Sequence, residues 1–114
     1  MALPVLFKDE DIVVVNKSSG LLVHRSAIDR HAQEFALQTV RDQLGQMVYP
    51  VHRLDRPTSG ALMFALSSAS ARHLSQEFSE GRVGKTYVAV VRGIPSADVV
   101  LDYPLKEEPD AKSD

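Results

Sequence analysis

The feature that most limits the possible folds is the run of β-branched residues at positions 12–15 (IVVV). Such residues favour an extended backbone. With no polar residue between them, the run is typical of a strand buried on both faces. A shorter apolar stretch at residues 4–7 precedes it, and the polar residues 8–11 (KDED) between the two are typical of a turn. We therefore expect a β-hairpin whose second strand lies in the interior.

Two helices are predicted further along, where apolar residues recur at helical spacing. The first covers residues 34–44 and ends at Gly45; the second has Ser67 or Ser68 as its N-cap and ends at Gly81. Their apolar stripes are Leu37, Val40 and Leu44 in the first, and Ala71, Leu74 and Phe78 in the second.

Further strands are predicted at residues 61–66 (ALMFAL) and at residues 85–92, with one more short pairing at residues 99–101. The second helix thus lies between two strands in a chain that is otherwise rich in strands. This order predicts an α+β domain with a mixed, mainly antiparallel sheet and two helices. Residues 106–114 are polar, and we expect them to be a disordered tail.

Composition limits the function classes. At 114 residues, with 44% hydrophobic and 25% charged residues, the chain has the size and make-up of one soluble globular domain. It contains no apolar run long enough to span a membrane, no signal-peptide pattern and no cysteine, so we expect a cytoplasmic protein without membrane partners. The net charge of −2 is not that of a basic nucleic-acid binder, although local basic clusters permit RNA binding.

The residues best suited to catalysis or binding lie at positions 51–60 (VHRLDRPTSG). Asp55 lies between Arg53 and Arg56, and nearby cations favour the ionised form of a carboxyl group. Such a carboxylate suits a nucleophile or an anchor for an arginine. The simpler interpretation is a surface turn with an ordinary Asp–Arg pair, and composition and spacing alone favour it.

The whole string His-Arg-Leu-Asp-x-x-Thr-Ser-Gly at residues 52–60 resembles the central motif of the RluA-type pseudouridine synthases. Residues 11–20 (DIVVVNKSSG) resemble the first motif of that family, with Ser18 in place of the usual proline. Residues 85–93 (KTYVAVVRG) resemble its Lys-x-Tyr-x-Ala-x-Val-x-Gly strand. The match covers nearly the whole chain.

Three further segments narrow the resemblance to the branch that modifies the uridine at position sixty-five of tRNA. They are residues 22–26 (LVHRS), 38–43 (QTVRDQ) and 101–105 (LDYPL). The first strand comes directly after Met1, so we expect no separate N-terminal RNA-binding domain of the kind that some relatives carry.

The resemblance implies a role for individual residues. From this resemblance we expect Asp55 to be the nucleophile that attacks the ribose C1′ or the uracil ring. The uracil is then expected to be detached, rotated and rejoined through C5 without cofactor or metal. Arg53 fills the space of the flipped uridine, and Tyr87 stacks on the uracil. The remaining RNA-binding candidates are His52, which belongs to the same motif, and Arg56 and Lys17, which are assigned to phosphates by charge.

The chain departs from the family after residue 93. Family members continue for about as many residues again, on the order of a second domain. That part supplies a Gly-Arg-x-His-Gln-Leu-Arg-type motif whose first arginine pairs with the catalytic aspartate, and residues 94–114 contain nothing similar. We therefore expect residues 1–105 to be the N-terminal part of a catalytic domain, inactive alone, with an exposed sheet edge that invites self-association.

Other classes have less support. The histidines at positions 24, 31, 52 and 73 lack the close spacing of zinc ligands. No Gly-x-Ser-x-Gly elbow or phosphate-binding glycine loop is present. A glycosidase requires a second placed carboxylate beside Asp55. Asp29 or Glu80 could be proposed, but neither lies in a recognisable motif. The remaining alternatives are a non-catalytic remnant that binds RNA weakly or self-associates, and a plain structural domain.

Overall fold

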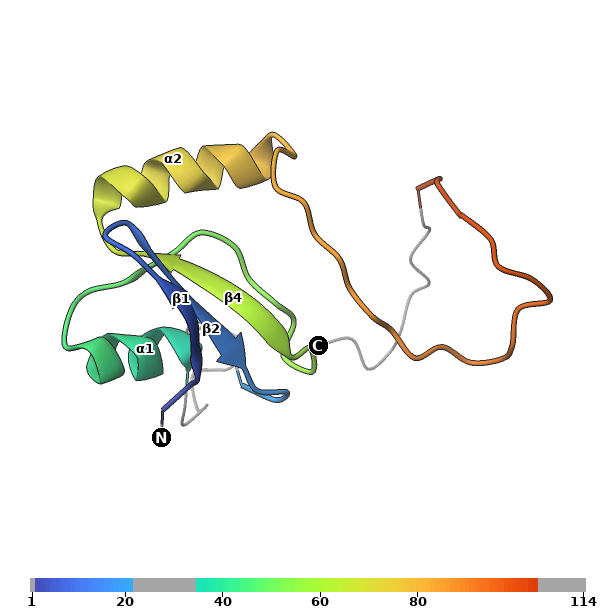
Figure 1. Ribbon diagram of the computed structural model, residues 1–114, viewed down its shortest axis with the longest axis horizontal. Helices are drawn as coiled ribbons and strands as arrows, with labels where there is room; N and C mark the ends of the chain where they lie inside the picture. The colour runs from blue at the N-terminus through green and yellow to red at the C-terminus, as the bar shows by residue number, and fades with distance from the viewer. Residues whose placement is uncertain (1, 22–34, 105–114) are drawn as a thin grey trace, which may run out of the picture.

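The computed structural model describes residues 2–21 and 35–104. The sheet has the strand order β1-β2-β4-β3, and its three pairings are all antiparallel. The predicted α+β class is confirmed, and the sheet is antiparallel throughout the described residues. The elements follow one another as β1 (Val5–Lys8), β2 (Ile12–Lys17), α1 (Ala36–Leu44), β3 (Tyr49–Pro50), β4 (Gly60–Ala65) and α2 (Ser68–Ser79) (Figure 1).

The predicted hairpin is formed by β1 and β2. Its turn is fixed by Asp9, whose carboxylate accepts hydrogen bonds from the backbone N–H of Asp11 at 2.8 Å and of Ile12 at 2.9 Å. This side chain satisfies two backbone donors that the tight turn leaves without partners, as Asp does in many turns. β1 is an edge strand, and all four of its side chains are exposed.

The core lies between α1 and one face of the sheet. Alternate residues of paired strands point to the same face, and the register places Val13 opposite Phe64 and Val15 opposite Leu62. The predicted stripe of α1 is confirmed, since Val40 is buried and Leu37 and Leu44 pack at its margins. The side chains with no exposed surface on this face are Val13, Val15, Leu62, Phe64, Ala36 and Val40.

Both helices end just before the predicted glycines, Gly45 and Gly81, which have positive φ, and α2 also begins at its predicted N-cap. Gly45 adopts the left-handed conformation with φ 68° and donates its N–H to the carbonyl of Arg41, an arrangement that glycine allows without steric cost. The N-cap of α2 is Ser67, whose side chain accepts from the N–H of Ser70 at 3.1 Å. No side chain of α2 is fully buried, and its predicted apolar face is only half covered.

The strand predicted at residues 85–92 and the pairing predicted at 99–101 are wrong. Residues 82–104, which we call the extended segment, contain no strand or helix. The segment first passes beside the sheet and then extends away from it (Figure 1). The alternating pattern is present, but a strand also needs a neighbour to accept its backbone hydrogen bonds. The segment instead leaves large apolar side chains in solvent, with Val88 97% and Ile94 96% exposed.

Some predictions fall outside the described residues. Among them are the polar tail at 106–114, the family-like segment at 22–26, and the positions of His24, Asp29 and His31. In the described ranges, no helix is long and apolar enough to cross a membrane. The same ranges hold no group of three His, Cys, Asp or Glu side chains that could bind a metal ion.

Candidate functional site

The central motif forms the loop between β3 and β4. Its two apolar members anchor it in the core, since Val51 is 8% and Leu54 7% exposed. The polar residues on either side of Leu54 are consequently turned outward, and Arg53 and Asp55 are exposed. The carbonyl of Asp55 accepts from the N–H of Thr58 at 2.9 Å, which closes a turn with Asp55 as its first residue.

A second loop, directly after β2, is tied to this turn by backbone contacts. The N–H of Gly20 donates to the carbonyl of Arg56 at 2.6 Å, and Arg56 Nε donates to the carbonyl of Gly20 at 3.1 Å. Ser19 Oγ adds a bond to the carbonyl of Pro57 at 2.7 Å. Gly20 has φ 90°, a conformation that side chains disfavour. The two family-like motifs are therefore joined directly beside Asp55.

Lys17 lies beneath this junction with no exposed surface. Its Nζ donates to the carbonyls of Ser18 at 3.0 Å and Arg56 at 3.1 Å, so the ammonium is bound to both loops. Burial lowers the pKa of Lys17, and the negative charge of Asp55 opposes that shift.

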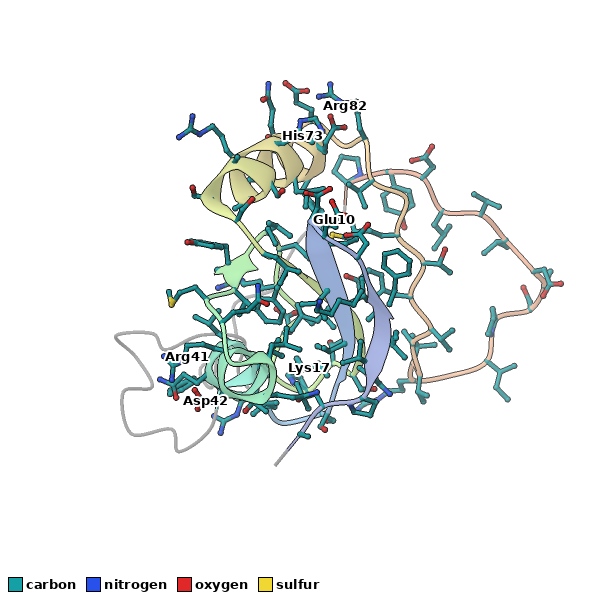
Figure 2. All side chains as sticks on the ribbon, turned by 60° about the vertical axis from the view of Figure 1, so that its left-hand side comes forward. Glu10, Lys17, Arg41, Asp42, His73 and Arg82 are labelled. Carbon is teal, nitrogen blue, oxygen red and sulfur yellow. The ribbon has the colours of Figure 1, made fainter. Side chains whose placement is uncertain are left out.

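These contacts bear on the role expected for Lys17. The sequence assigned Lys17 to a phosphate contact by its charge alone. In the structure the side chain is enclosed, and its ammonium donates to backbone carbonyls. A phosphate contact of Lys17 stays a prediction, and two of the three donors of its ammonium are already taken by backbone carbonyls. Figure 2 shows Lys17 among the side chains of the interior.

The arrangement of charges around Asp55 also differs from expectation. Within the described residues, no ion pair joins Asp55 to Arg53 or to Arg56. Arg56 directs its Nε to the Gly20 carbonyl, while Arg53 is exposed. The cation that interacts electrostatically with Asp55 is Lys17, which proximity in the sequence does not reveal.

His52 is oriented into the protein. Its Nε2 accepts a hydrogen bond from the backbone N–H of Met63 at 3.0 Å. The ring stacks on Phe78 of α2, with centroids 4.6 Å apart and an angle of 11° between the planes. Burial lowers the pKa of His52, and the nearby positive charge of Lys85 lowers it further. The neutral imidazole is thus favoured.

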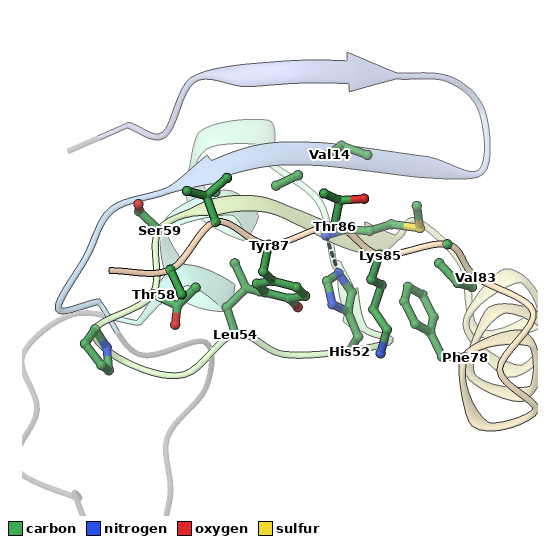
Figure 3. Close-up of a pocket in the computed structure, with 17 residues that line it drawn as sticks. Val14, His52, Leu54, Thr58, Ser59, Phe78, Val83, Lys85, Thr86 and Tyr87 are labelled. Carbon is green, nitrogen blue, oxygen red and sulfur yellow. Dashed lines mark hydrogen bonds between the residues drawn. The ribbon is translucent and has the colours of Figure 1, made fainter. Parts of the chain in front are cut away.

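A cleft of about 750 Å³ opens beside the loop (Figure 3). One wall is the sheet face opposite α1, another is the motif loop, and the third is the start of the extended segment. Tyr87, 59% exposed, belongs to this third wall and shares the cleft with His52 and Leu54. The lining residues are Val14, Gly60, Ala61 and Met63 of the sheet, His52, Leu54 and 57–59 of the loop, and Phe78 with 83–89.

The predicted site residues are only partly brought together by this cleft. His52 and Tyr87 line it, whereas Arg53, Asp55 and Arg56 lie on the adjoining turn and do not line it. Lys85 and Phe78 also line the cleft and were not singled out from the sequence as site residues. Lys85 is the first residue of the Lys-x-Tyr pattern, so that pattern could have identified it as a site residue. Phe78 lines the cleft only through its tertiary packing on His52, which the sequence does not reveal.

Similarity to known proteins agrees with this geometry. A family model described as RNA pseudouridylate synthase matches residues 11–114. The proteins named tRNA pseudouridine synthase C from Pasteurella multocida and Vibrio cholerae are 52% and 54% identical over 100% and 98% of the chain. The protein of that name from Pectobacterium carotovorum subsp. carotovorum is 57% identical over 98%. These alignments cover 47%, 46% and 30% of the three relatives, so the chain spans about half their length or less.

Solved structures give the same result for the fold. The human RNA pseudouridylate synthase domain containing 1 superposes with a TM-score of 0.55 and 30% identity, over 70% of this chain and 29% of that one. The human RNA pseudouridylate synthase domain containing 4 superposes with a TM-score of 0.53 and 25% identity, over 69% of this chain and 30% of that one. The resemblance predicted from residues 11–20, 52–60 and 85–93 is confirmed, and the chain belongs to the RNA pseudouridylate synthase family.

Proposed function

We propose that this chain is the N-terminal part of the catalytic domain of a tRNA pseudouridine synthase, which isomerises the uridine at position sixty-five. Residues 1–105 form that part, and residues 106–114 are a polar tail. The observation that carries the proposal is the placement of Asp55 on an exposed, doubly anchored turn beside a cleft that contains Tyr87. Relatives at 52–57% identity that are named tRNA pseudouridine synthase C support it.

Asp55 is the proposed nucleophile. Its carboxylate attacks the ribose C1′ or the uracil ring, and the bond between N1 and C1′ breaks with its electron pair on N1. After rotation of the base, C5 forms the new bond to C1′, the C5 proton leaves to solvent, and N1 takes up a proton. The bond between the Asp55 oxygen and C1′ or the ring carbon breaks with its electron pair on oxygen, so the carboxylate is regenerated. The rearrangement has no net oxidation and no external acceptor, so we propose that it uses neither cofactor nor metal.

The cleft wall supports a stacking role for Tyr87. An aromatic ring in a partly exposed position offers a face to a flipped base, a contact worth about 1–3 kcal/mol per base. Arg53 is exposed on the loop, next to Leu54 of the cleft lining, and we propose that it fills the gap left in the RNA. Arg56 is proposed to contact phosphate beside the same turn.

The chain alone is proposed to be inactive. A glycosyl intermediate survives only where water is excluded, whereas Asp55 is exposed and Tyr87 is 59% exposed. The described residues also place no arginine in an ion pair with Asp55. We propose that the remaining part of a complete synthase supplies this arginine and covers the cleft, and that the enzyme acts on tRNA in the cytoplasm.

The test is release of tritium from tRNA labelled at uridine C5. The chain is assayed alone and after addition of the part of the Pasteurella multocida relative that lies beyond the alignment, with Asp55→Asn as the control. We expect release only from the combined parts and only with Asp55 present. Release that persists with Asp55→Asn would overturn the role of Asp55, and release by the chain alone would overturn its incompleteness. Co-purification of the parts without any release would overturn the proposed activity.

A non-catalytic role is the second candidate, favoured by the exposed apolar side chains of β1 and of the extended segment. Phe7 on the edge strand is 52% exposed and Val88 is 97% exposed. An edge strand presents unpaired backbone groups that invite pairing with another copy. Sedimentation velocity over a range of concentrations tests self-association, and comparison of Phe7→Lys with Val88→Lys shows which surface carries it. A chain that stays monomeric and does not bind tRNA in a filter assay contradicts this candidate.

A further inference from the structure

The edge of the sheet next to the motif is completed by a side chain. β3 pairs with β4 at only two positions, Tyr49 opposite Ala65 and Pro50 opposite Phe64. β4 continues beyond this pairing toward its N-terminal end, so the N–H of Met63 faces an edge from which β3 has departed. His52 Nε2 accepts that N–H at 3.0 Å. The imidazole therefore takes the place that a carbonyl of a longer β3 would occupy.

The same ring is held from a second side. It stacks on Phe78 at 4.6 Å with nearly parallel planes, which connects the loop to α2. Offset aromatic stacking stabilises such a pair by about 0.5–1.5 kcal/mol beyond burial. One side chain thus links the first residues of the loop to β4 through a hydrogen bond and to α2 through a stacked ring.

A second clamp lies directly after Asp55. Arg56 is fixed through its carbonyl by the N–H of Gly20 and by Lys17 Nζ. Asp55 is thus the residue before one clamp, and His52 forms the other clamp three residues upstream. Only Arg53 and Leu54 lie between His52 and Asp55, and Leu54 is anchored in the core.

We propose that neutral His52, with its proton on Nδ1, is a positioning residue that holds the Asp55 turn in register with β4. This inference rests on the proposed function of Asp55 and adds the upstream restraint to it. It also replaces the expected RNA contact of His52, because Nε2 is engaged inside the protein. Protonation of Nε2 would remove the acceptor and release Met63 N–H.

The charges around His52 bear on that protonation. The extended segment contributes Lys85, whose positive charge opposes a second proton on the ring. α2 carries Arg72, His73 and Glu77, and the Glu77 carboxylate is engaged by Arg82 at 2.7 Å and lies 3.8 Å from His73. β4 contains no charged residue, and the loop itself carries Arg53, Asp55 and Arg56.

The first test is nuclear magnetic resonance on the full chain. Long-range nitrogen–proton spectra give the tautomer directly, and we expect Nε2 to be the unprotonated nitrogen at pH 7.5. His73, on the surface of α2, is the internal reference. A protonated Nε2 on His52 would overturn the proposal without any variant having to fold.

The second test uses two substitutions that separate the acceptor from the ring. His52→Phe keeps a ring to stack on Phe78 but offers no acceptor, and His52→Gln keeps an acceptor but loses the ring. We expect the Met63 amide to exchange about tenfold faster in His52→Phe, as for a lost hydrogen bond, and to be largely restored in His52→Gln. Equal exchange in the wild type and His52→Phe would overturn the proposal.

The third test measures activity and uses the chain combined with the remaining part of the Pasteurella multocida relative. We expect His52→Phe to lower kcat by about tenfold with little change in KM for tRNA, with partial recovery in His52→Gln. A change in KM alone would show that His52 contacts RNA and would overturn the positioning role. If the wild-type combination releases no tritium, the proposed function fails, and the tautomer and amide exchange still decide whether His52 orders the turn.

Discussion

The ammonium of Lys17 donates to the backbone carbonyl of Arg56 at 3.1 Å, directly after the residue proposed as nucleophile. One buried cation thereby connects the end of β2 with the Asp55 turn, across a separation of 39 residues between Lys17 and Arg56. The neighbouring Ser18 carbonyl takes a second bond from the same atom. The backbone carbonyls of Arg56 and Pro57 in the loop that carries Asp55 are thus held by donors from the segment directly after β2 and from Lys17 at its end.

Removing this cation is expected to destabilise the fold. Lys17→Met keeps the apolar stem but leaves the Ser18 carbonyl without its lysine donor, and we expect a loss of about 1–3 kcal/mol in the free energy of unfolding. Urea denaturation measures it. The matched control is Lys8→Met, because Lys8 lies exposed on the edge strand and its loss is expected to change stability by less than about 0.5 kcal/mol. Equal effects of the two substitutions would contradict the buried role of Lys17.

The contribution of His52 to stability should depend on pH in a definite direction. Its pKa is lowered in the folded state, so at intermediate pH the unfolded state binds more protons than the folded state, and stability rises with pH there. The contribution is complete above about pH 6.5, the ordinary value for histidine, and is lost as pH falls toward the folded pKa. We expect the difference in unfolding free energy between the wild type and His52→Phe to grow between about pH 5 and 7. A difference that shrinks over this range would contradict the assignment.

Substitution of Asp55 is expected to abolish most activity while leaving stability nearly unchanged. Because the side chain is exposed, Asp55→Asn is expected to change the free energy of unfolding by less than about 0.5 kcal/mol. In the combined enzyme it is expected to reduce turnover on the order of 10⁴-fold, as for other essential nucleophiles. Thermal unfolding and tritium release give the two quantities. Asp98→Asn, at an exposed position far along the extended segment, is the control and should affect neither.

Tyr87 is expected to act through its ring. Tyr87→Ala should weaken productive binding of tRNA by about 1–3 kcal/mol, while Tyr87→Phe should retain most of it because stacking needs no hydroxyl. Single-turnover kinetics on the combined enzyme measure the effect. Tyr103→Ala is a close control, since Tyr103 is 60% exposed against 59% for Tyr87 and does not line the cleft. If Tyr103→Ala has the larger effect, the assigned base-stacking residue is wrong.

Gly20 permits the junction between the two loops. With φ 90° and no atom within 4 Å of an added Cβ, the cost of Gly20→Ala comes from backbone strain alone, about 1–2 kcal/mol. Gly84→Ala is the comparison, because no positive φ is found there and its surroundings are equally open. Urea denaturation of both variants should show a loss at Gly20 and little change at Gly84.

The sequence was sufficient for those parts of the fold that depend on local chemistry. The hairpin, both helix ends and the core strand at residues 61–66 were predicted from turn residues, caps and apolar periodicity, and each is found. The strand at 85–92 was wrong because pairing depends on a partner that periodicity does not include. β3 is only two residues long and contains Pro50, so it gave no periodic signal.

The candidate site shows the same division. The motif at residues 52–60 identified the loop and the family, because these depend on residue order. The burial of Lys17 and the use of His52 Nε2 as a backbone acceptor depend on contacts between residues that are 39 and 11 positions apart. From sequence alone, a charged or titratable side chain is predicted to be exposed, because its buried partners are known only from the tertiary structure.

The exposed backbone of residues 82–104 also determines where the molecule is vulnerable. Proteases bind several consecutive residues of unfolded or extended backbone, and such exposed segments are their preferred cutting sites. Lys85 and Arg92 both lie in this segment, whereas the backbone of the sheet and helices is hydrogen-bonded. Brief trypsin treatment should therefore cut after Lys85 before it cuts within the sheet or the helices, and so separate Tyr87 from the Asp55 turn.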